Sequence, residues 1–236
     1  MMSAEPSLRE FNMAKRRQRI LAEARRLITD GGVEALNLRT LAAAAEVTVP
    51  TIYNLIGNKE AIVFALFAEA LAEIEQRAGK PDYASPLELA EAVVTESTGV
   101  FAEDEDYFRA ALIALEHLDT TAAHHNAAAG VYEWAGRIIA RGLTACFEAG
   151  LLCGRIPVHA LTAQILRGYR TSCRAWAFGQ LSIEEFRAAA LTDVYTCLAA
   201  DAVETFHAQL IKKIAVLVDT TAPFTKHRGH GGGVKP

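Results

Sequence analysis

Apolar side chains recur at intervals of three and four residues along most of the chain. In an early stretch they fall at Ile20, Leu21, Ala24, Leu27 and Ile28, with arginines mostly between them. This spacing places apolar residues on one face of an α-helix and does not fit the alternation of a strand. Alanine, the best helix former and a poor strand former, is the commonest residue, with 44 copies against 7 prolines. We therefore expect an all-α protein.

Start and stop signals divide the chain into about nine helices. Gly31 and Gly32 are expected to end the first helix, and Asn37 and Thr48 to cap two short helices that a very short turn separates. Six longer helices follow. One is expected to begin at Asn58 and others at capping boxes starting at Ser85 and Ser182. The last three are expected at about 122–149, 158–179 and 183–217, after weaker boundaries near 104–106 and 119–121.

The order of elements in the first sixty residues is that of a helix-turn-helix unit, whose last helix enters the major groove of DNA. On that last helix Thr51 and Tyr53 supply hydroxyl groups, and Lys59 stands at the start of the following helix. Hydroxyls, helix N-termini and lysine are groups that bind phosphate oxygens. Tyr53 or Lys59 alone would be an ordinary surface residue, but the ordered set favours contact with DNA.

The distribution of charge supports a two-domain organisation. The 236 residues carry a net charge of −4, which by itself argues against a nucleic-acid binder. Residues 1–60, however, contain nine Lys and Arg against seven Asp and Glu, and the remainder contains fifteen against twenty-one. We expect a helix-turn-helix domain at 12–60, a helical-bundle domain at 61–220 and a disordered tail at 221–236.

The cysteines and the apolar content indicate a soluble, cytoplasmic protein. The four cysteines are far apart and form no C-x-x-C pair, which favours free thiols in a reducing compartment; they are Cys146, Cys153, Cys173 and Cys197. The first thirty residues contain no apolar signal segment, and no stretch approaches the roughly 18 apolar residues of a membrane span. No association with a membrane is expected.

Catalysis and metal binding are not expected. The sequence has no glycine-rich phosphate loop, no H-E-x-x-H and no G-x-S-x-G, so we expect neither an enzyme nor a bound cofactor. Glu116, His117 and His124 could in principle ligate a metal, since seven residues are two turns of one helix. The boundary near 119–121 interrupts that helix, so no metal site is expected.

The first part of the chain resembles the TetR family of transcriptional regulators. The resemblance covers about fifty residues and rests on an ordered set of short motifs: Ile20-Leu21-Ala22-Glu23-Ala24 with Leu27, Gly31-Gly32, Leu38-Arg39-Thr40-Leu41-Ala42, Val47-Thr48, Thr51-Ile52-Tyr53-Asn54-Leu55 and Lys59-Glu60-Ala61-Ile62. The helical remainder has the size and composition of that family's effector-binding and dimerisation domain. The chain departs from the family pattern at Glu46, where glycine is usual, at Val49, and at Ile56-Gly57.

The resemblance implies which residues contact double-stranded operator DNA. Those expected to hold phosphates are Thr51, Tyr53 and Lys59, and those expected to face bases are Val49, Pro50 and Asn54. Thr48 caps the same helix, and Arg39 and Thr40 lie where the preceding helix reaches the DNA. Apolar residues such as Val49 and Pro50 would read bases by contact, for example with thymine methyl groups.

For the second domain the resemblance implies a small-molecule effector, a repressor mechanism and a homodimer formed through helices 158–179 and 183–217. The effector is expected to be small and largely apolar. Side chains that could line its pocket, although each is by default an ordinary core residue, are Phe67, Phe101, Phe108, Trp134, Tyr169 and Cys173. Tyr107 and Tyr132 are further aromatic candidates.

Two questions stay open from the sequence. Arg167, Arg170 and Arg174 gather on one side of the helix at 158–179, where they could meet solvent, an acidic partner surface or an anionic effector. A different function is also compatible with the acidic net charge and Val49: a helical protein-interaction or scaffold module whose DNA-binding unit has decayed. Salt-dependent DNA binding distinguishes the two functions.

Overall fold

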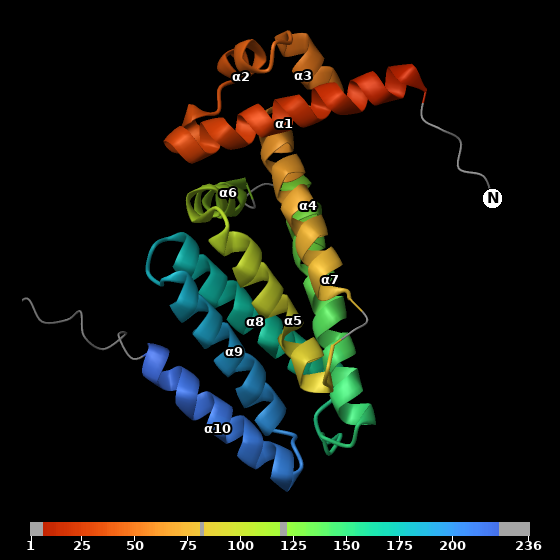
Figure 1. Ribbon diagram of the computed structural model, residues 1–236, viewed down its shortest axis with the longest axis vertical. Helices are drawn as coiled ribbons and strands as arrows, with labels where there is room; N and C mark the ends of the chain where they lie inside the picture. Colours follow the sequence, from red (N-terminus) through yellow and green to blue (C-terminus); the bar gives the residue numbers. More distant parts are fainter. Residues whose placement is uncertain (1–6, 81–82, 119–121, 222–236) are drawn as a thin grey trace, which may run out of the picture. The chain divides into compact units, whose positions relative to one another are not determined.

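A computed structural model describes the backbone of residues 7–80, 83–118 and 122–221 (Figure 1). Over these residues it contains ten α-helices and no strand apart from an isolated bridge between Leu152 and Ala202. The expectation of an all-α protein is confirmed. The helices are α1 (Leu8–Ala35), α2 (Leu38–Ala44), α3 (Val49–Leu55), α4 (Lys59–Ala78), α5 (Pro86–Ala102), α6 (Glu105–Leu118), α7 (Ala122–Glu148), α8 (Val158–Ala177), α9 (Ile183–Ala199) and α10 (Glu204–Thr221).

The predicted caps are present in the structure. Asn37 accepts a hydrogen bond from the backbone N–H of Arg39, at 2.8 Å, and Ser182 forms a complete capping box with Glu185. Gly31 and Gly32 leave helical geometry within α1, and Gly32 has a φ of 69°, so the regular helix stops where glycine predicts. The beginning of α1 was not predicted. It lies at Leu8, where Ser7 and Glu10 form another capping box.

The structure divides the pattern expected at 183–217 into two helices, α9 and α10. The break depends on Asp201, whose side chain is 1% exposed. The carboxylate of Asp201 accepts hydrogen bonds from the backbone N–H groups of Gly154, at 2.8 Å, and Arg155, at 2.9 Å. Its backbone carbonyl accepts another from Cys153, at 2.7 Å. Asp201 thus fastens the α9–α10 connection to the loop that follows α7.

The chain forms two compact units, and their limits do not coincide with the limits expected from the sequence. One unit comprises Met1–Ile74 and Val100–Val131, and the other Glu75–Gly99 and Tyr132–Pro236. Three helices, α4, α5 and α7, have residues in both units. The division into compact units does not test the domain limits expected from the sequence, so the domains at 12–60 and 61–220 stay a prediction.

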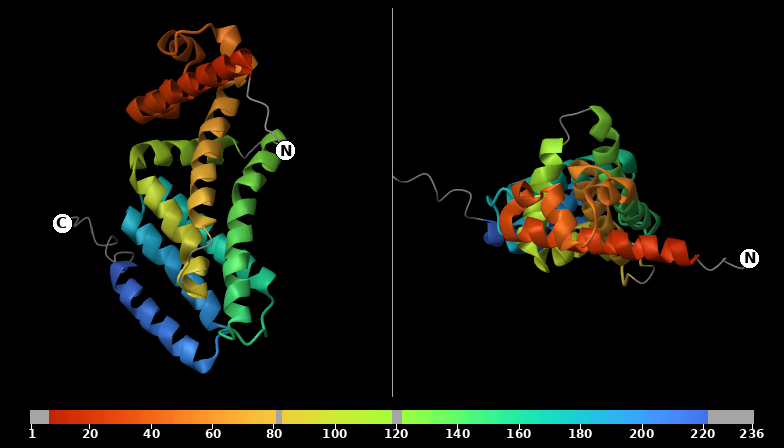
Figure 2. Two further views of the ribbon diagram at one scale, coloured as in Figure 1. Left: turned by 45° about the vertical axis from the view of Figure 1, so that its right-hand side comes forward. Right: turned by 90° about the horizontal axis from the view of Figure 1, so that it is seen from above.

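The core of the first unit holds the short helices in place. Helices α1, α2 and α3 contact one another, and α6 also contacts α1 (Figure 2). The side chains buried among the first four helices come from every one of them; they include Ile20, Leu21, Ala24, Ile28, Leu41, Ile52 and Ile62. The apolar side chains of α1 that predicted the first helix are therefore the side chains that face the core.

In the second unit α8, α9 and α10 lie side by side, with α9 in the middle (Figure 1). Helix α9 has eight buried residues, among them Phe186, Ala190, Val194 and Leu198 along one side. A polar contact joins α9 to two other helices. The Tyr195 hydroxyl donates to Glu91 of α5 at 2.7 Å, and the Lys213 ammonium of α10 lies 3.3 Å from the same carboxylate. Burial and this carboxylate raise the pKa of Tyr195.

Helices α5 and α7 of the second unit come close enough for their backbones to touch. A Cβ atom placed on Gly142 of α7 would lie 2.5 Å from the backbone of Ala90 in α5. Such a distance is far below van der Waals contact, so only glycine is compatible with this approach.

We predict that Asp201→Ala lowers the free energy of unfolding by about 2 kcal/mol, because two backbone N–H groups lose a charged acceptor. Asp201→Asn keeps one acceptor oxygen and should cost less. Urea denaturation of the full chain measures both variants. A loss below about 0.5 kcal/mol for Asp201→Ala, the usual range for surface substitutions, would contradict this role.

Candidate nucleic-acid interface

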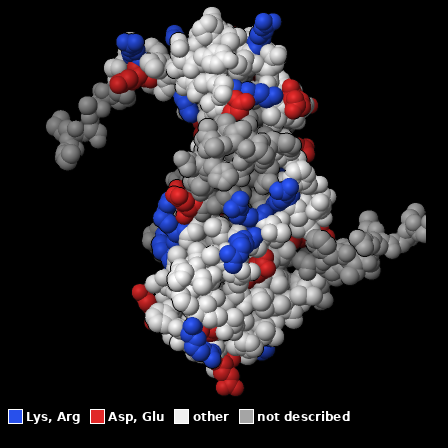
Figure 3. All heavy atoms as spheres, turned by 180° about the vertical axis from the view of Figure 1, so that it is seen from behind, with Lys and Arg blue, Asp and Glu red and all other residues white. Residues whose placement is uncertain are grey.

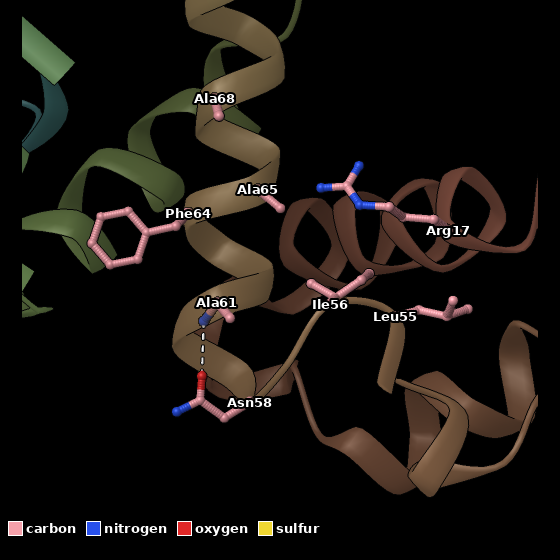
Figure 4. Close-up of a pocket in the computed structure, with 8 residues that line it drawn as sticks. All are labelled: Arg17, Leu55, Ile56, Asn58, Ala61, Phe64, Ala65 and Ala68. Atoms are coloured by element: carbon pink, nitrogen blue, oxygen red, sulfur yellow. Dashed lines mark hydrogen bonds between the residues drawn. The ribbon is translucent and has the colours of Figure 1, made fainter. Parts of the chain in front are cut away.

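Helix α3 is fixed by its N-cap and by one buried side chain. The Thr48 hydroxyl accepts a hydrogen bond from the backbone N–H of Thr51 at 3.3 Å, and Pro50 occupies the first turn, where no N–H is needed. Ile52 is 0% exposed. Beyond the helix, Asn58 caps α4 by accepting from the backbone N–H of Ala61 at 3.0 Å, as predicted (Figure 4).

The predicted DNA contacts all lie at the surface of the helix-turn-helix unit. At about 100° per residue, Pro50 and Asn54 point away from buried Ile52, while Thr51 and Tyr53 lie on opposite flanks of α3. Tyr53 is 53% exposed, although tyrosine has a large apolar ring. The exposed members of the set are Arg39, Thr40, Thr48, Pro50, Tyr53 and Asn54, and the half-buried members are Val49, Thr51 and Lys59.

The hydroxyls of Thr48 and Thr51 form a pair at the N-terminus of α3. Their oxygen atoms lie 2.8 Å apart, and either can donate to the other. Whichever hydroxyl accepts within the pair keeps its own hydrogen for an outside acceptor. The pair therefore presents one oriented hydroxyl donor beside the N-terminus of α3, where the helix dipole favours an anion.

The turn between α2 and α3 has glutamate in a conformation that usually requires glycine. Glu46 has a φ of 50°, and the backbone N–H of Val47 bonds to the carbonyl of Ala42 at 2.9 Å, as at a left-handed helix C-terminus. Arg19 of α1 contacts this turn. Its guanidinium lies 3.3 Å from the Glu46 carboxylate and donates to the Glu46 carbonyl, also at 3.3 Å.

Arg25 of α1 connects the helix-turn-helix to α6. The Arg25 guanidinium donates to the Asp104 carboxylate at 3.0 Å and lies 4.4 Å from the centre of the Tyr107 ring. Asp104 precedes α6, and its second oxygen accepts from the backbone N–H of Tyr107 at 3.4 Å. Burial raises the pKa of Tyr107 to about 12, so at neutral pH Arg25 covers an uncharged phenol.

Two surface hollows are lined by described residues of this unit. One, of about 490 Å³, lies between α1, the end of α3 and the alanine-rich side of α4 (Figure 4). Arg17 reaches along this hollow, and its guanidinium lies 3.5 Å from the Glu69 carboxylate. The other, of about 640 Å³, lies between the first turns of α1 and helix α3.

The six candidate effector residues are all buried, and they divide between the two units. Phe67, Phe101 and Phe108 belong to the first unit, and the Phe101 and Phe108 ring centres lie 5.0 Å apart. The candidates in the second unit are Trp134, Tyr169 and Cys173. Neither surface hollow is lined by any of the six. Their burial is compatible with a pocket and with ordinary core packing.

Trp134 differs from the other candidates because its polar atom has no partner. The side chain is 5% exposed, and within the described part of the chain its Nε1 makes no hydrogen bond. Buried tryptophan N–H groups usually find an acceptor, because an unsatisfied buried donor costs about 1–3 kcal/mol.

The arginine row of α8 lies at the surface of the second unit. Arg167, Arg170 and Arg174 are all exposed. Arg167 donates to Gln164, and the Arg174 guanidinium lies 5.4 Å from the Phe178 ring centre. Figure 3 shows several Lys and Arg side chains gathered on one face of the molecule.

Two further findings concern the residues that the structure describes. No helix among them is long and apolar enough to cross a membrane. They also contain no cluster of three or more His, Cys, Asp and Glu side chains suited to a metal ion. Glu116, His117, His124 and Tyr132 lie outside the residues whose side chains are described.

Some residues of the interface could not be identified from the sequence. The Arg25 contact joins positions 79 residues apart, and no local motif signals it. The early start of α1 does have a local signal, because Ser7 and Glu10 form the S-x-x-E pattern of a capping box.

The fold and the exposed helix α3 define a helix-turn-helix DNA-binding unit attached to a helical bundle. Residues 20–66 match the family model of the bacterial regulatory proteins of the tetR family. The resemblance predicted from the sequence is therefore confirmed over these residues.

Individual proteins are similar to this chain in sequence or in fold. The chain is 29% identical over 119 residues to the HTH-type transcriptional repressor KstR of Rhodococcus jostii, a match that spans 50% of this chain and 56% of KstR. Its fold is similar to FadR of Bacillus subtilis in complex with stearoyl-CoA, with a TM-score of 0.63, 18% identity and coverage of 77% and 97% of the two chains. SmeT, the repressor of a Stenotrophomonas maltophilia efflux pump, has a TM-score of 0.63, 17% identity and coverage of 80% and 92%.

We predict that Glu46→Gly is more stable than Glu46→Ala by about 1 kcal/mol. Both variants lose the carboxylate that Arg19 contacts, but only glycine relieves the left-handed backbone. Thermal and urea unfolding of the two variants isolate this difference. Equal stability would show that the backbone at this turn carries no strain.

Proposed function

We propose that this protein is a cytoplasmic, ligand-responsive transcriptional repressor that binds a palindromic operator through α3. The main support for this proposal is the geometry of α3, where Ile52 is buried while all of the predicted DNA contacts lie at the surface. The similarity to KstR, which is a transcriptional repressor, supports the regulatory role.

In this proposal the two flanks of α3 hold the DNA backbone and its outer face reads bases. Thr51, Tyr53 and Lys59 bind phosphates, helped by the Thr48 hydroxyl. Pro50 and Asn54 face the bases together with Val49. Asn54 can form two hydrogen bonds with adenine, whereas Pro50 and Val49 can only make apolar contacts. Arg39 and Thr40 contact the DNA from the adjacent helix.

The proposed homodimer uses the C-terminal helices, and burial within one chain supports a choice among their faces. Helix α9 lies between α8 and α10, and eight of its seventeen residues are buried within its own chain. The outer face of α10, in contrast, exposes apolar side chains, with Ile211 at 46% and Val216 at 72% exposure. We therefore propose that α8 and α10, rather than α9, supply most of the dimer contact.

The proposed effector is largely apolar and carries at least one hydrogen-bond acceptor. Its apolar character follows from the candidate residues, which are mostly aromatic and all buried. The acceptor follows from Trp134, whose buried N–H has no partner in the described part of the chain. The stearoyl-CoA bound to FadR has both properties and is a suitable first probe.

We predict that the full chain selects a palindromic site from a library of random duplex DNA. Tyr53→Phe and Lys59→Ala should weaken binding to the selected site and to unrelated DNA by similar factors, because phosphate contacts carry no sequence information. Fluorescence anisotropy measures both affinities, with exposed Lys80→Ala, outside the proposed dimer helices, as the charge-matched control. An absence of selected DNA at low salt would refute the proposed function and favour a protein-interaction module.

We predict that Trp134→Phe separates effector binding from folding. Phenylalanine keeps an aromatic ring and removes the unpaired N–H, so the free variant should be at least as stable as the native chain. Affinity for an effector that accepts from Trp134 should fall about tenfold, the effect of removing one hydrogen bond. Thermal shift against a panel of acyl-CoA thioesters, stearoyl-CoA first, measures both quantities.

Operator affinity without effector should be unchanged in Trp134→Phe, which anisotropy can check. A large loss of stability in the free variant would instead mean that Trp134 is an ordinary core residue.

A further inference from the structure

The first three turns of α1 extend beyond the core of the DNA-binding unit. Ile20 is the first buried residue of α1, and none of residues 8–19 is buried. The family match also begins at residue 20, so this N-terminal part of α1 lies outside the matched domain. Its helical state has a local cause, the capping box of Ser7 and Glu10. We call residues 8–19 the α1 arm.

The α1 arm is strongly basic. It contains five Arg and Lys residues and a single acidic residue, Glu10. The Glu10 carboxylate is engaged with Ser7, accepting from its backbone N–H at 2.8 Å and its hydroxyl at 2.9 Å, and these bonds lower the Glu10 pKa. Glu10 therefore stays ionised at the cap without pairing with the basic side chains.

Only some of the basic side chains of the arm have an acidic partner. Arg17 is paired with Glu69, and Arg19 with Glu46. Within the described part of the chain Arg9, Lys15 and Arg16 form no ion pair. Two of these three, Arg9 and Arg16, line the hollow of about 640 Å³ beside α3.

The hollow places the arm against the recognition helix. Arg9, Asn12 and Arg16 are spaced at i, i+3 and i+7, which puts them on one face of α1. The opposite wall includes Thr51 and Asn54 of α3. Two guanidinium groups that form no ion pair with any described residue thus lie, with one amide, along the flank of α3 that carries Thr51, which is opposite to the Tyr53 flank.

We propose that this hollow binds the DNA phosphodiester backbone immediately outside the base pairs that α3 contacts. The guanidinium groups of Arg9 and Arg16 bind successive phosphates, and Asn12 donates a hydrogen bond between them. Leu8 and Met13, which also line the hollow and are exposed, pack against the sugars. The inference rests on the proposed DNA-binding function and adds a contact surface of about three helical turns to it.

Charge identifies DNA as the occupant. The hollow contributes two positive charges and no negative one, which favours an anionic partner. DNA backbone is the polyanion that α3 would bring to this position. The competing occupant is an acidic surface of a second copy, since residues 61–236 carry a net charge of −6.

The test compares Arg9→Ala/Arg16→Ala with Lys80→Ala/Arg141→Ala, which removes the same charge at exposed positions that neither line the hollow nor belong to the proposed dimer helices. Anisotropy measures the affinity of each full-length variant for the selected site and for unrelated DNA between 50 and 300 mM salt, roughly the range over which counterion release is resolved. The hollow variant should bind both DNAs roughly tenfold more weakly at 100 mM salt, with an unchanged ratio between them.

The salt dependence gives a second readout. The slope of log affinity against log salt should fall by about 0.9 for each phosphate that the protein no longer binds, which is about 1.8 per protomer for the double substitution. Ethylation interference on the selected site should locate these phosphates outside the base pairs that the selection identifies. Circular dichroism should show the same melting temperature as the native chain, because Arg9 and Arg16 are exposed.

Each outcome decides between the proposals. If the native chain selects a site and the hollow variant behaves like the control, the arm does not bind DNA although the proposed function stands. If the native chain selects no site, the proposed function itself fails. A change in sedimentation of the free protein with an unchanged salt slope would identify a second copy as the occupant and overturn the inference.

Discussion

A seven-residue α-helix is not stable in water by itself, because the cost of nucleating it exceeds the few hydrogen bonds it forms. Helices α2 and α3 both have this length. They exist because Leu41 and Ile52 are fully buried against α1 and because Asn37 and Thr48 satisfy their first N–H groups. The surface proposed to read DNA is therefore a consequence of what these helices bury. Loss of the core would remove the interface even with every surface residue intact.

The features that could be predicted from the sequence are those that depend on nearby residues. Caps, glycine stops and the apolar stripe of α1 involve contacts within a few positions, and the structure contains them at Asn37, Asn58 and Ser182. The surface position of the residues of α3 predicted to contact DNA follows from helical spacing around buried Ile52. The helix break at Asp201 was missed because its cause lies 46 and 47 residues earlier, at Arg155 and Gly154. No periodicity in a single sequence reports such a contact.

The candidate effector residues illustrate a second reason for the limits of sequence reasoning. Aromatic residues that line a pocket and aromatic residues that fill a core have the same composition and spacing, so the sequence cannot separate them. Phe108 packs with Phe101 and lies beneath Arg25, which also holds Asp104 at the start of α6. The same aromatic side chains therefore join α6 to the helix that supports the DNA-binding surface. Any displacement of α6 must change the environment of an arginine on α1.

The contact at Gly142 limits the kind of motion that the second unit can make. Where two helices meet through side chains, those side chains can repack and let the helices approach. Helices α5 and α7 have no such layer at this point, because the backbone of Ala90 already occupies the space where a Cβ of residue 142 would lie. A rearrangement of this pair is consequently a sliding or a separation, and never a closure. A molecule that enters beside this crossing has to be accommodated by opening.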